Sequence, residues 1–115
     1  MALTAQELQF ELMRLATADN LDGDRVVKDL KAHANLWEGA LIGRNDLVGL
    51  RDLRDGYWNA DTLVVLSSGK DDAVLEALAK NWQADSVSWI EGEAAVTLIG
   101  GSTRSQPRIL MVWWD

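Results

Sequence analysis

Two stretches of the chain contain residue types that could bind an anionic ligand. The first lies between an apolar run and a helical pattern. It consists of Ser67, Ser68, Gly69 and Lys70. Backbone N–H groups at the start of a helix attract anions, and the lysine would strengthen that attraction. The stretch is not a Walker A loop, since Val64 and Asp71 stand where that motif needs a glycine and a hydroxyl residue. It is therefore either an anion site or a plain turn between a strand and a helix.

The second stretch, residues 100–108, has a local excess of positive charge from Arg104 and Arg108. Such a segment can bind an anion, close over a ligand, or serve only as a connecting loop. Two acidic residues, Glu91 and Glu93, follow the next apolar run along the chain. If the carboxyl ends of the flanking strands meet, we expect these groups to line a small-ligand pocket.

Asp61 and Asp85 form a carboxylate pair of the kind that serves metal binding or acid–base catalysis. Each of them directly precedes a predicted strand. Ligands of open α/β sheets bind beyond the carboxyl ends of the parallel strands, which is the opposite end. We therefore predict that this pair has a structural role and is not catalytic.

Other catalytic and metal chemistries lack the residues they need. The chain has no cysteine, which excludes a disulfide scaffold, a thiolate zinc site and a cysteine nucleophile. Its one histidine, His33, has no second histidine for a metal pair and no serine in a nucleophile context. The acidic turn 19–24 has calcium-loop character only at Gly23, because the position of the final ligand is Asp29 and not a glutamate. We expect no metal and no cofactor, and a protein that is more readily a non-enzyme than an enzyme.

A repeated phrase organises the second half of the chain. Residues 58–66 read WNADTLVVL and residues 82–90 read WQADSVSWI, an offset of 24 residues. A helical pattern over 71–82 joins the two copies. This layout predicts a strand–helix–strand unit whose strands are parallel neighbours.

The first 56 residues read as three helices. A capping box at the start predicts a helix over 4–18. Apolar spacing predicts a second helix over 24–42, or alternatively a break near Asn35 with LWEGALIG as an extended piece. The third pattern, 46–56, is either a short helix or a hairpin that turns at its end.

The remaining residues read as strands, and the chain as a single domain over 1–115. Its helical segment is 1–56, and its sheet segment, 57–115, has the order βαβββ. The predicted fold is α/β or α+β, a mixed four-stranded sheet with the three N-terminal helices packed on it. The expected strands are 62–67, 86–90, 94–99 and 108–114.

Six tryptophans, against one phenylalanine and one tyrosine, suggest an interface in addition to a core. Because neighbours in a strand point to opposite faces, Trp113 and Trp114 cannot both lie on the helix side. We place an apolar patch of Leu110, Val112 and Trp114 on the face opposite the helices, with Trp113 as a further interface residue. The alternative is that the N-terminal helices cover this face.

The net charge and the distribution of apolar residues indicate which kinds of partner the chain can bind. The chain of 115 residues has a net charge of −7, which disfavours binding to phosphate backbones. No apolar run is long enough for a membrane span, and the start lacks a signal-peptide pattern, so we expect a cytoplasmic protein. The acidity serves either solubility or a basic partner.

Two functions follow from these observations. The first is a non-catalytic protein-interaction module, such as an inhibitor, an immunity-like protein or an adaptor, with a homodimer as one form that it can take. The alternative is a small-ligand-binding protein or modest enzyme, with its pocket at the carboxyl ends of strands 62–67 and 86–90.

Overall fold

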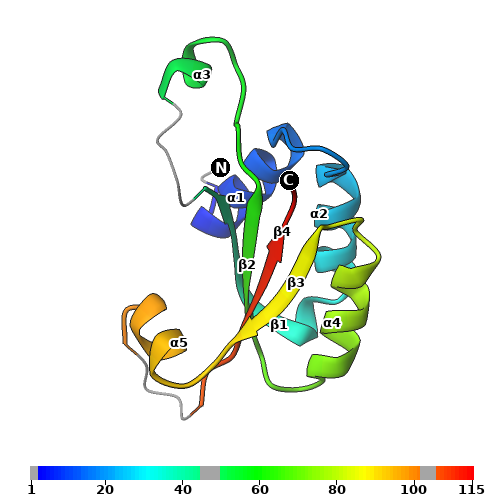
Figure 1. Ribbon diagram of the computed structural model, residues 1–115, viewed down its shortest axis with the longest axis vertical. Coiled ribbons are helices and arrows are strands. Elements are labelled where there is room, and N and C mark those ends of the chain that lie inside the picture. Colours follow the sequence, from blue (N-terminus) through cyan, green and yellow to red (C-terminus); the bar gives the residue numbers. More distant parts are fainter. Residues whose placement is uncertain (1–2, 45–49, 102–105) are drawn as a thin grey trace.

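The computed structural model describes residues 3–44, 50–101 and 106–115, which form a mixed α+β fold with a four-stranded antiparallel sheet (Figure 1). A short 3₁₀ turn, Ala34–Leu36, precedes the first strand. The strands are β1 (Trp37–Gly43), β2 (Thr62–Ser67), β3 (Ser86–Ile90) and β4 (Ile109–Trp113). The five described α-helices are α1 (Ala5–Leu15), α2 (Gly23–Ala32), α3 (Leu50–Arg54), α4 (Asp72–Lys80) and α5 (Gly92–Leu98).

The strand order is β1-β2-β4-β3, and every neighbouring pair is antiparallel. β2 and β3 run in the same direction, as the repeat predicts, because both are antiparallel to β4. The prediction that they are neighbours was wrong, since β4 lies between them. The residue types explain the order: β4 is apolar throughout and suits a central position, whereas β3 contains two serines and suits an edge.

Two segments differ in type from the prediction. The predicted strand 94–99 was wrong: residues 94–98 belong to helix α5, and Ile99 is its C-cap. Ala94 and Ala95 are strong helix formers, and Gly92, with a φ of +64°, turns the chain out of β3. The fourth strand is instead β1, so the extended alternative for LWEGALIG is confirmed and the helix over 24–42 was wrong beyond Ala32.

The outer edge of β1 is bound by glutamine side chains from α1. Gln6 receives a hydrogen bond from the Ala40 N–H at 2.9 Å, and its amide donates to the Ala40 carbonyl at 2.8 Å. Gln9 accepts from the Ile42 N–H at 2.9 Å. The helix therefore satisfies backbone groups that a bare edge strand would offer to another chain.

The third N-terminal helix is present as α3, so the helical alternative is confirmed for the described part of 46–56. Residues 45–49 lie outside the described residues. α3 does not pack on the sheet as predicted: it projects beyond one end of the sheet (Figure 1), and none of its residues is buried. Its leucines, Leu50 and Leu53, are largely exposed.

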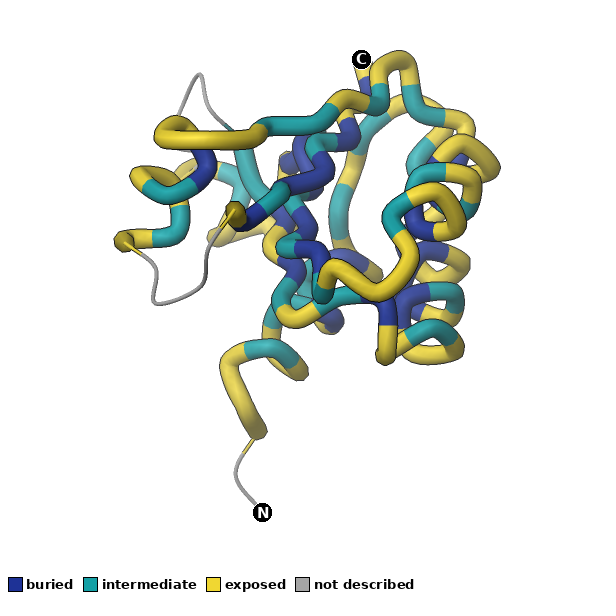
Figure 2. Tube along the Cα trace, turned by 90° about the horizontal axis from the view of Figure 1, so that it is seen from below, coloured by how far each residue is buried: buried dark blue, intermediate teal, exposed yellow. Residues whose placement is uncertain are grey.

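The core lies between one face of the sheet and the helices α1, α2 and α4. Figure 1 shows α2 and α4 along one side of the sheet, and Figure 2 shows buried segments gathered in the middle of the molecule. Burial of each large apolar side chain contributes about 1.5–3 kcal/mol. The largest fully buried side chains are Trp114, Met13, Leu30, Leu63, Leu75, Leu110, Val26, Val27, Val65 and Val112.

The two aspartates of the repeat hold the end of β4 from both sides. The Asp61 carbonyl accepts a hydrogen bond from the Trp114 N–H at 2.9 Å, and the Asp85 N–H donates to the Trp113 carbonyl at 2.8 Å. The Asp85 carboxylate also accepts from the Asp115 N–H at 2.7 Å. These contacts hold the end of β4. That the pair is not catalytic stays a prediction, because it used a rule for parallel strands and every strand pair here is antiparallel.

One glycine is required by close packing between α1 and α2. A Cβ added to Gly23 would lie 1.8 Å from the Met13 carbonyl oxygen, too close for any side chain. We predict that Gly23→Ala lowers the free energy of unfolding by about 3 kcal/mol or more, because backbone and not a flexible side chain must move. Denaturant unfolding measures this change.

Gly43→Ala is the matched control for that substitution. Its added Cβ would meet no atom closer than 3.9 Å, and it lies in a strand where glycine is unfavourable. We expect a change of less than about 1 kcal/mol. Equal losses for the two variants would contradict the close approach of the two helices.

Candidate functional site

The sheet has one face covered by helices and one face that is largely open. Leu110, Val112 and Trp114 are 0% exposed and point toward the helices, so their expected placement on the opposite face was wrong. The alternative, in which helices cover these residues, is what the structure shows. Trp113 points the other way and is 38% exposed.

The register of the strands explains this assignment. Val112 is opposite Leu63 and Leu110 is opposite Val65, so all four share the helix-covered face. The intervening residues must point to the other face, because side chains alternate along a strand. The open face therefore receives a second set of apolar side chains, and these are Leu41, Val64, Leu66, Ile90, Ile109, Met111 and Trp113.

A groove of about 630 Å³ lies on this open face. Within the described residues no helix crosses the middle of the face, and α5 lies at one end of the sheet (Figure 1). We call this feature the apolar groove. Its lining residues are Gln9, Gly39, Ala40, Leu41, Val64, Leu66, Leu98, Ile99, Ile109 and Met111.

The groove is apolar and accessible. Leu98 is 62% exposed and Leu41 is 52% exposed, while none of the residues that line the groove is charged. A contiguous exposed apolar surface of this kind marks a binding site more often than scattered single residues do. Sequence reasoning missed Leu41, Val64, Leu66 and Met111. The signal that could have found them was the alternation of side chains along each of the strands β1, β2 and β4.

The carboxyl ends of β2 and β3 bring together part of the predicted ligand site. The Ser67 hydroxyl donates to the Asp72 carboxylate, and Arg108 donates to Asp72 and to Glu91, the latter at 2.9 Å. The space beside Ser67, Gly69 and Arg108 is only about 50 Å³. Small-molecule pockets are typically about 300–1,000 Å³, so this end of the sheet is filled mainly by its own side chains.

Arg108 is the centre of an ion-pair network. Its guanidinium lies 4.1 Å from the centre of the Trp89 ring, and the indole N–H of Trp89 donates to Glu76 at 2.8 Å. Burial alone would lower the pKa of Arg108, but hydrogen bonds to Asp72 and Glu91 raise the pKa above its ordinary value. The arginine therefore joins β4 to α4 and to the end of β3, and its charge is already balanced.

The other predicted ligand residues do not join this network. Ser68 donates through its hydroxyl to the Asn35 carbonyl at 2.7 Å, and Lys70 is exposed. Glu93 lines a separate surface hollow beside Pro107. Arg104 lies outside the described residues.

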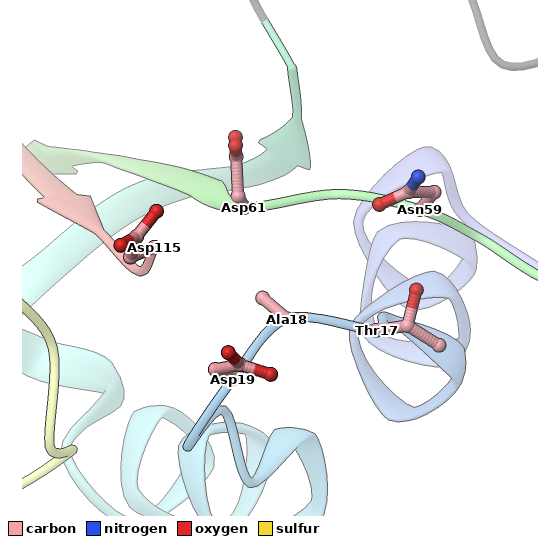
Figure 3. A pocket seen from close by; sticks show the side chains of 6 residues that line it. All are labelled: Thr17, Ala18, Asp19, Asn59, Asp61 and Asp115. Atoms are coloured by element: carbon pink, nitrogen blue, oxygen red, sulfur yellow. The ribbon is translucent and has the colours of Figure 1, made fainter.

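An acidic hollow lies at the opposite end of the sheet (Figure 3). Three of the residues that line it are acidic: Asp19, Asp61 and Asp115. Asp61 already accepts a hydrogen bond from Thr62 at 2.8 Å, and it points away from Asp19 in Figure 3. Among the residues that the structure describes, no group of three or more acidic or histidine side chains is arranged to hold a metal ion.

Two further observations concern the class of protein. In the described parts of the chain no helix has the length and apolar character needed to cross a membrane. Comparison with protein-family models, curated proteins and solved structures finds no match for the chain. The function must therefore be inferred from the groove and the charges around it.

The Trp89 hydrogen bond lowers the pKa of Glu76, and a hydrogen bond and the charge of Lys80 lower it further. We predict that Trp89→Phe raises the pKa of Glu76 toward 4.5, because the ring is retained while the N–H donor is lost. Lys80→Ala should also raise the pKa, because it removes a hydrogen bond and a positive charge. NMR titration of the Glu76 carboxyl measures both changes, and an unchanged pKa in Trp89→Phe would contradict the role of the indole N–H.

The lowered pKa of Glu76 also makes the stability of the fold depend on pH. A carboxyl whose pKa is lowered by folding stabilises the native state above its unfolded pKa, near 4.5. That stabilisation is lost as the pH falls through the lower native value. The acid limb of the stability curve of Trp89→Phe should therefore be shallower than that of the unaltered chain.

Proposed function

We propose that the chain is a non-catalytic protein-interaction module that binds its partner on the apolar groove. The observation that supports this proposal most strongly is an apolar face of the central sheet that described helices leave uncovered. Folding alone does not require Val64, Leu66 and Met111 to be apolar, because this face is not part of the main core. Binding of another macromolecule would explain why these three residues are apolar.

The distribution of polar groups supports binding over catalysis. The serines, the arginine and the carboxylates at the carboxyl ends of β2 and β3 bond to one another. The repeated aspartates hold the end of β4. An inhibitor, an immunity-like protein or an adaptor is consistent with this arrangement, and so is self-association.

A small-ligand-binding function is the second candidate, and it receives less support. It would place the ligand at the carboxyl ends of strands 62–67 and 86–90, where the open space is about 50 Å³. A ligand there would have to displace Arg108 from Asp72. We therefore place the interaction surface on the groove.

Site-specific photo-crosslinking tests the proposed surface. We predict that a photo-reactive phenylalanine analogue at Met111, in the cells that make this protein, gives a defined adduct with a partner. The same analogue at Val74, an exposed residue of α4 on the other side of the sheet, should give none. Mass spectrometry identifies the adduct, and binding of the purified partner confirms it.

The control separates a specific surface from general stickiness. Equal adducts at both positions, or adducts at Val74 alone, would reject the groove as the interaction surface. An adduct with a second copy of the chain would support the module and identify the partner as the chain itself.

A further inference from the structure

We infer that the outer edge of β3 binds the same edge of a second copy of the chain, so that the two sheets join into one. This surface is separate from the apolar groove, and the inference does not depend on the proposed function. It rests on the backbone groups of β3 that face outward, on the protection of the other edge of the sheet, and on the way in which β3 can pair with itself.

The hydrogen bonds of β4 show which backbone groups of β3 face outward. The Ser67 N–H donates to the Arg108 carbonyl at 3.0 Å, and the Trp114 N–H donates to the Asp61 carbonyl at 2.9 Å. Both bonds follow the register of β2 against β4, and such bonds recur at every second residue of an antiparallel strand. The even-numbered residues of β4 therefore direct their backbone groups toward β2, and the odd-numbered residues direct theirs toward β3.

The register of β3 against β4 then fixes the direction of each residue in β3. Ser86, Ser88 and Ile90 are opposite odd-numbered residues of β4, so their backbone groups bond to that strand. The N–H and C=O groups of Val87 and Trp89 must point away from β4, and β3 is the outermost strand on this side (Figure 1). Within the described parts of the chain no hydrogen-bond partner for these groups is present. Neither residue is buried.

The two edges of the sheet differ in their protection. The edge formed by β1 has a shift in register between Trp37 and Gly39, and the side chains of Gln6 and Gln9 bind its backbone. Such irregular and covered edges prevent one sheet from adding to another. β3 has an uninterrupted register, no proline and no charged residue. Its edge therefore keeps the hydrogen-bonding capacity that strand addition requires.

The sequence of β3, SVSWI, suits antiparallel pairing with itself. If a twofold axis passes beside Ser88, Val87 lies opposite Trp89 of the partner subunit, and each such pair exchanges two hydrogen bonds. A β-branched residue opposite an aromatic residue is a stabilising cross-strand pair. The two Ser88 side chains face each other across the axis, and their small size lets the strands approach. This one register satisfies every outward group of both edges.

A second copy suits the edge better than a single extended segment of another protein. Such a segment would satisfy the backbone of β3 but would present its own outer edge in turn. A symmetric contact uses the same edge on both subunits, so no free edge of this kind remains.

The contact is short, and its two ends are acidic. In the same register Asp85 lies near Glu91 of the partner subunit, and each copy has a net charge of −7. Small interfaces are typical of transient complexes. We therefore expect a weak, concentration-dependent dimer that added salt strengthens, because salt screens the repulsion between the subunits.

Amide hydrogen exchange of the purified full chain, followed by NMR at several concentrations, tests the inference. In dilute solution the N–H groups of Val87 and Trp89 should exchange quickly because they have no partner, whereas the N–H of Ser88 should exchange slowly. At a concentration where sedimentation shows mostly dimer, exchange at Val87 and Trp89 should slow by about fivefold or more. Exchange at Ser88 should change less.

Ser88→Lys tests the pairing directly, because it places two ammonium groups opposite each other across the axis. Natural edge strands use lysine in this way to prevent pairing. The substitution should raise the dissociation constant of the dimer at least about tenfold. Leu8→Lys is the matched control, since it adds the same charge at an exposed residue of α1, at the opposite edge of the sheet. It should leave the constant within about twofold, and thermal melting verifies that both variants fold.

Three outcomes would overturn the inference. A chain that stays monomeric at every concentration its solubility allows would exclude a second copy as the occupant. Exchange at Val87 and Trp89 as slow as at Ser88 in dilute solution would show that their N–H groups are already bonded within one chain. A dimer that leaves this exchange unchanged, or that Leu8→Lys weakens as much as Ser88→Lys does, would form through another surface.

Discussion

The structure depends on the alternation of side chains along β4. This strand is central and apolar throughout, and both of its neighbours are fixed in register against it. Its end is held by the backbone of Asp61 on one side and of Asp85 on the other. Because of that fixation, Leu110, Val112 and Trp114 must enter the core, and the indole N–H of Trp114 can donate to the Trp82 carbonyl at 3.0 Å.

The same alternation creates the groove. If one set of β4 side chains is buried under α2 and α4, the other set must emerge on the opposite face. Met111 and Trp113 belong to this set, and Val64 and Leu66 of β2 join them. The groove and the core are therefore two consequences of one strand register, and a slip of one residue would exchange the side chains that form them. The glutamines of α1 occupy backbone groups of Ala40 and Ile42 that the adjoining edge would otherwise offer to another strand.

Much of the fold could be predicted from the sequence, and the errors have physical causes. The capping box of Thr4 and the common direction of β2 and β3 followed from local patterns. The position of β4 between β2 and β3 did not, because strand order depends on long-range pairing. Local patterns also failed for α5, where alternation and helix propensity competed. For the candidate site, they placed Trp113 and Trp114 on opposite faces but assigned Trp114 to the wrong one, and they missed the groove around Met111. Only tertiary packing decides which face the helices cover.

The most direct test of the account uses the absence of cysteine from the chain. Val64 and Val65 are adjacent and chemically identical, yet Val65 is fully buried and Val64 lines the groove. The rate of thiol labelling in single Val64→Cys and Val65→Cys variants reports which side chain solvent reaches. We predict rapid labelling at residue 64 and strong protection at residue 65. Equal protection of both, or the reverse order, would show that the sheet has no open apolar face at this position.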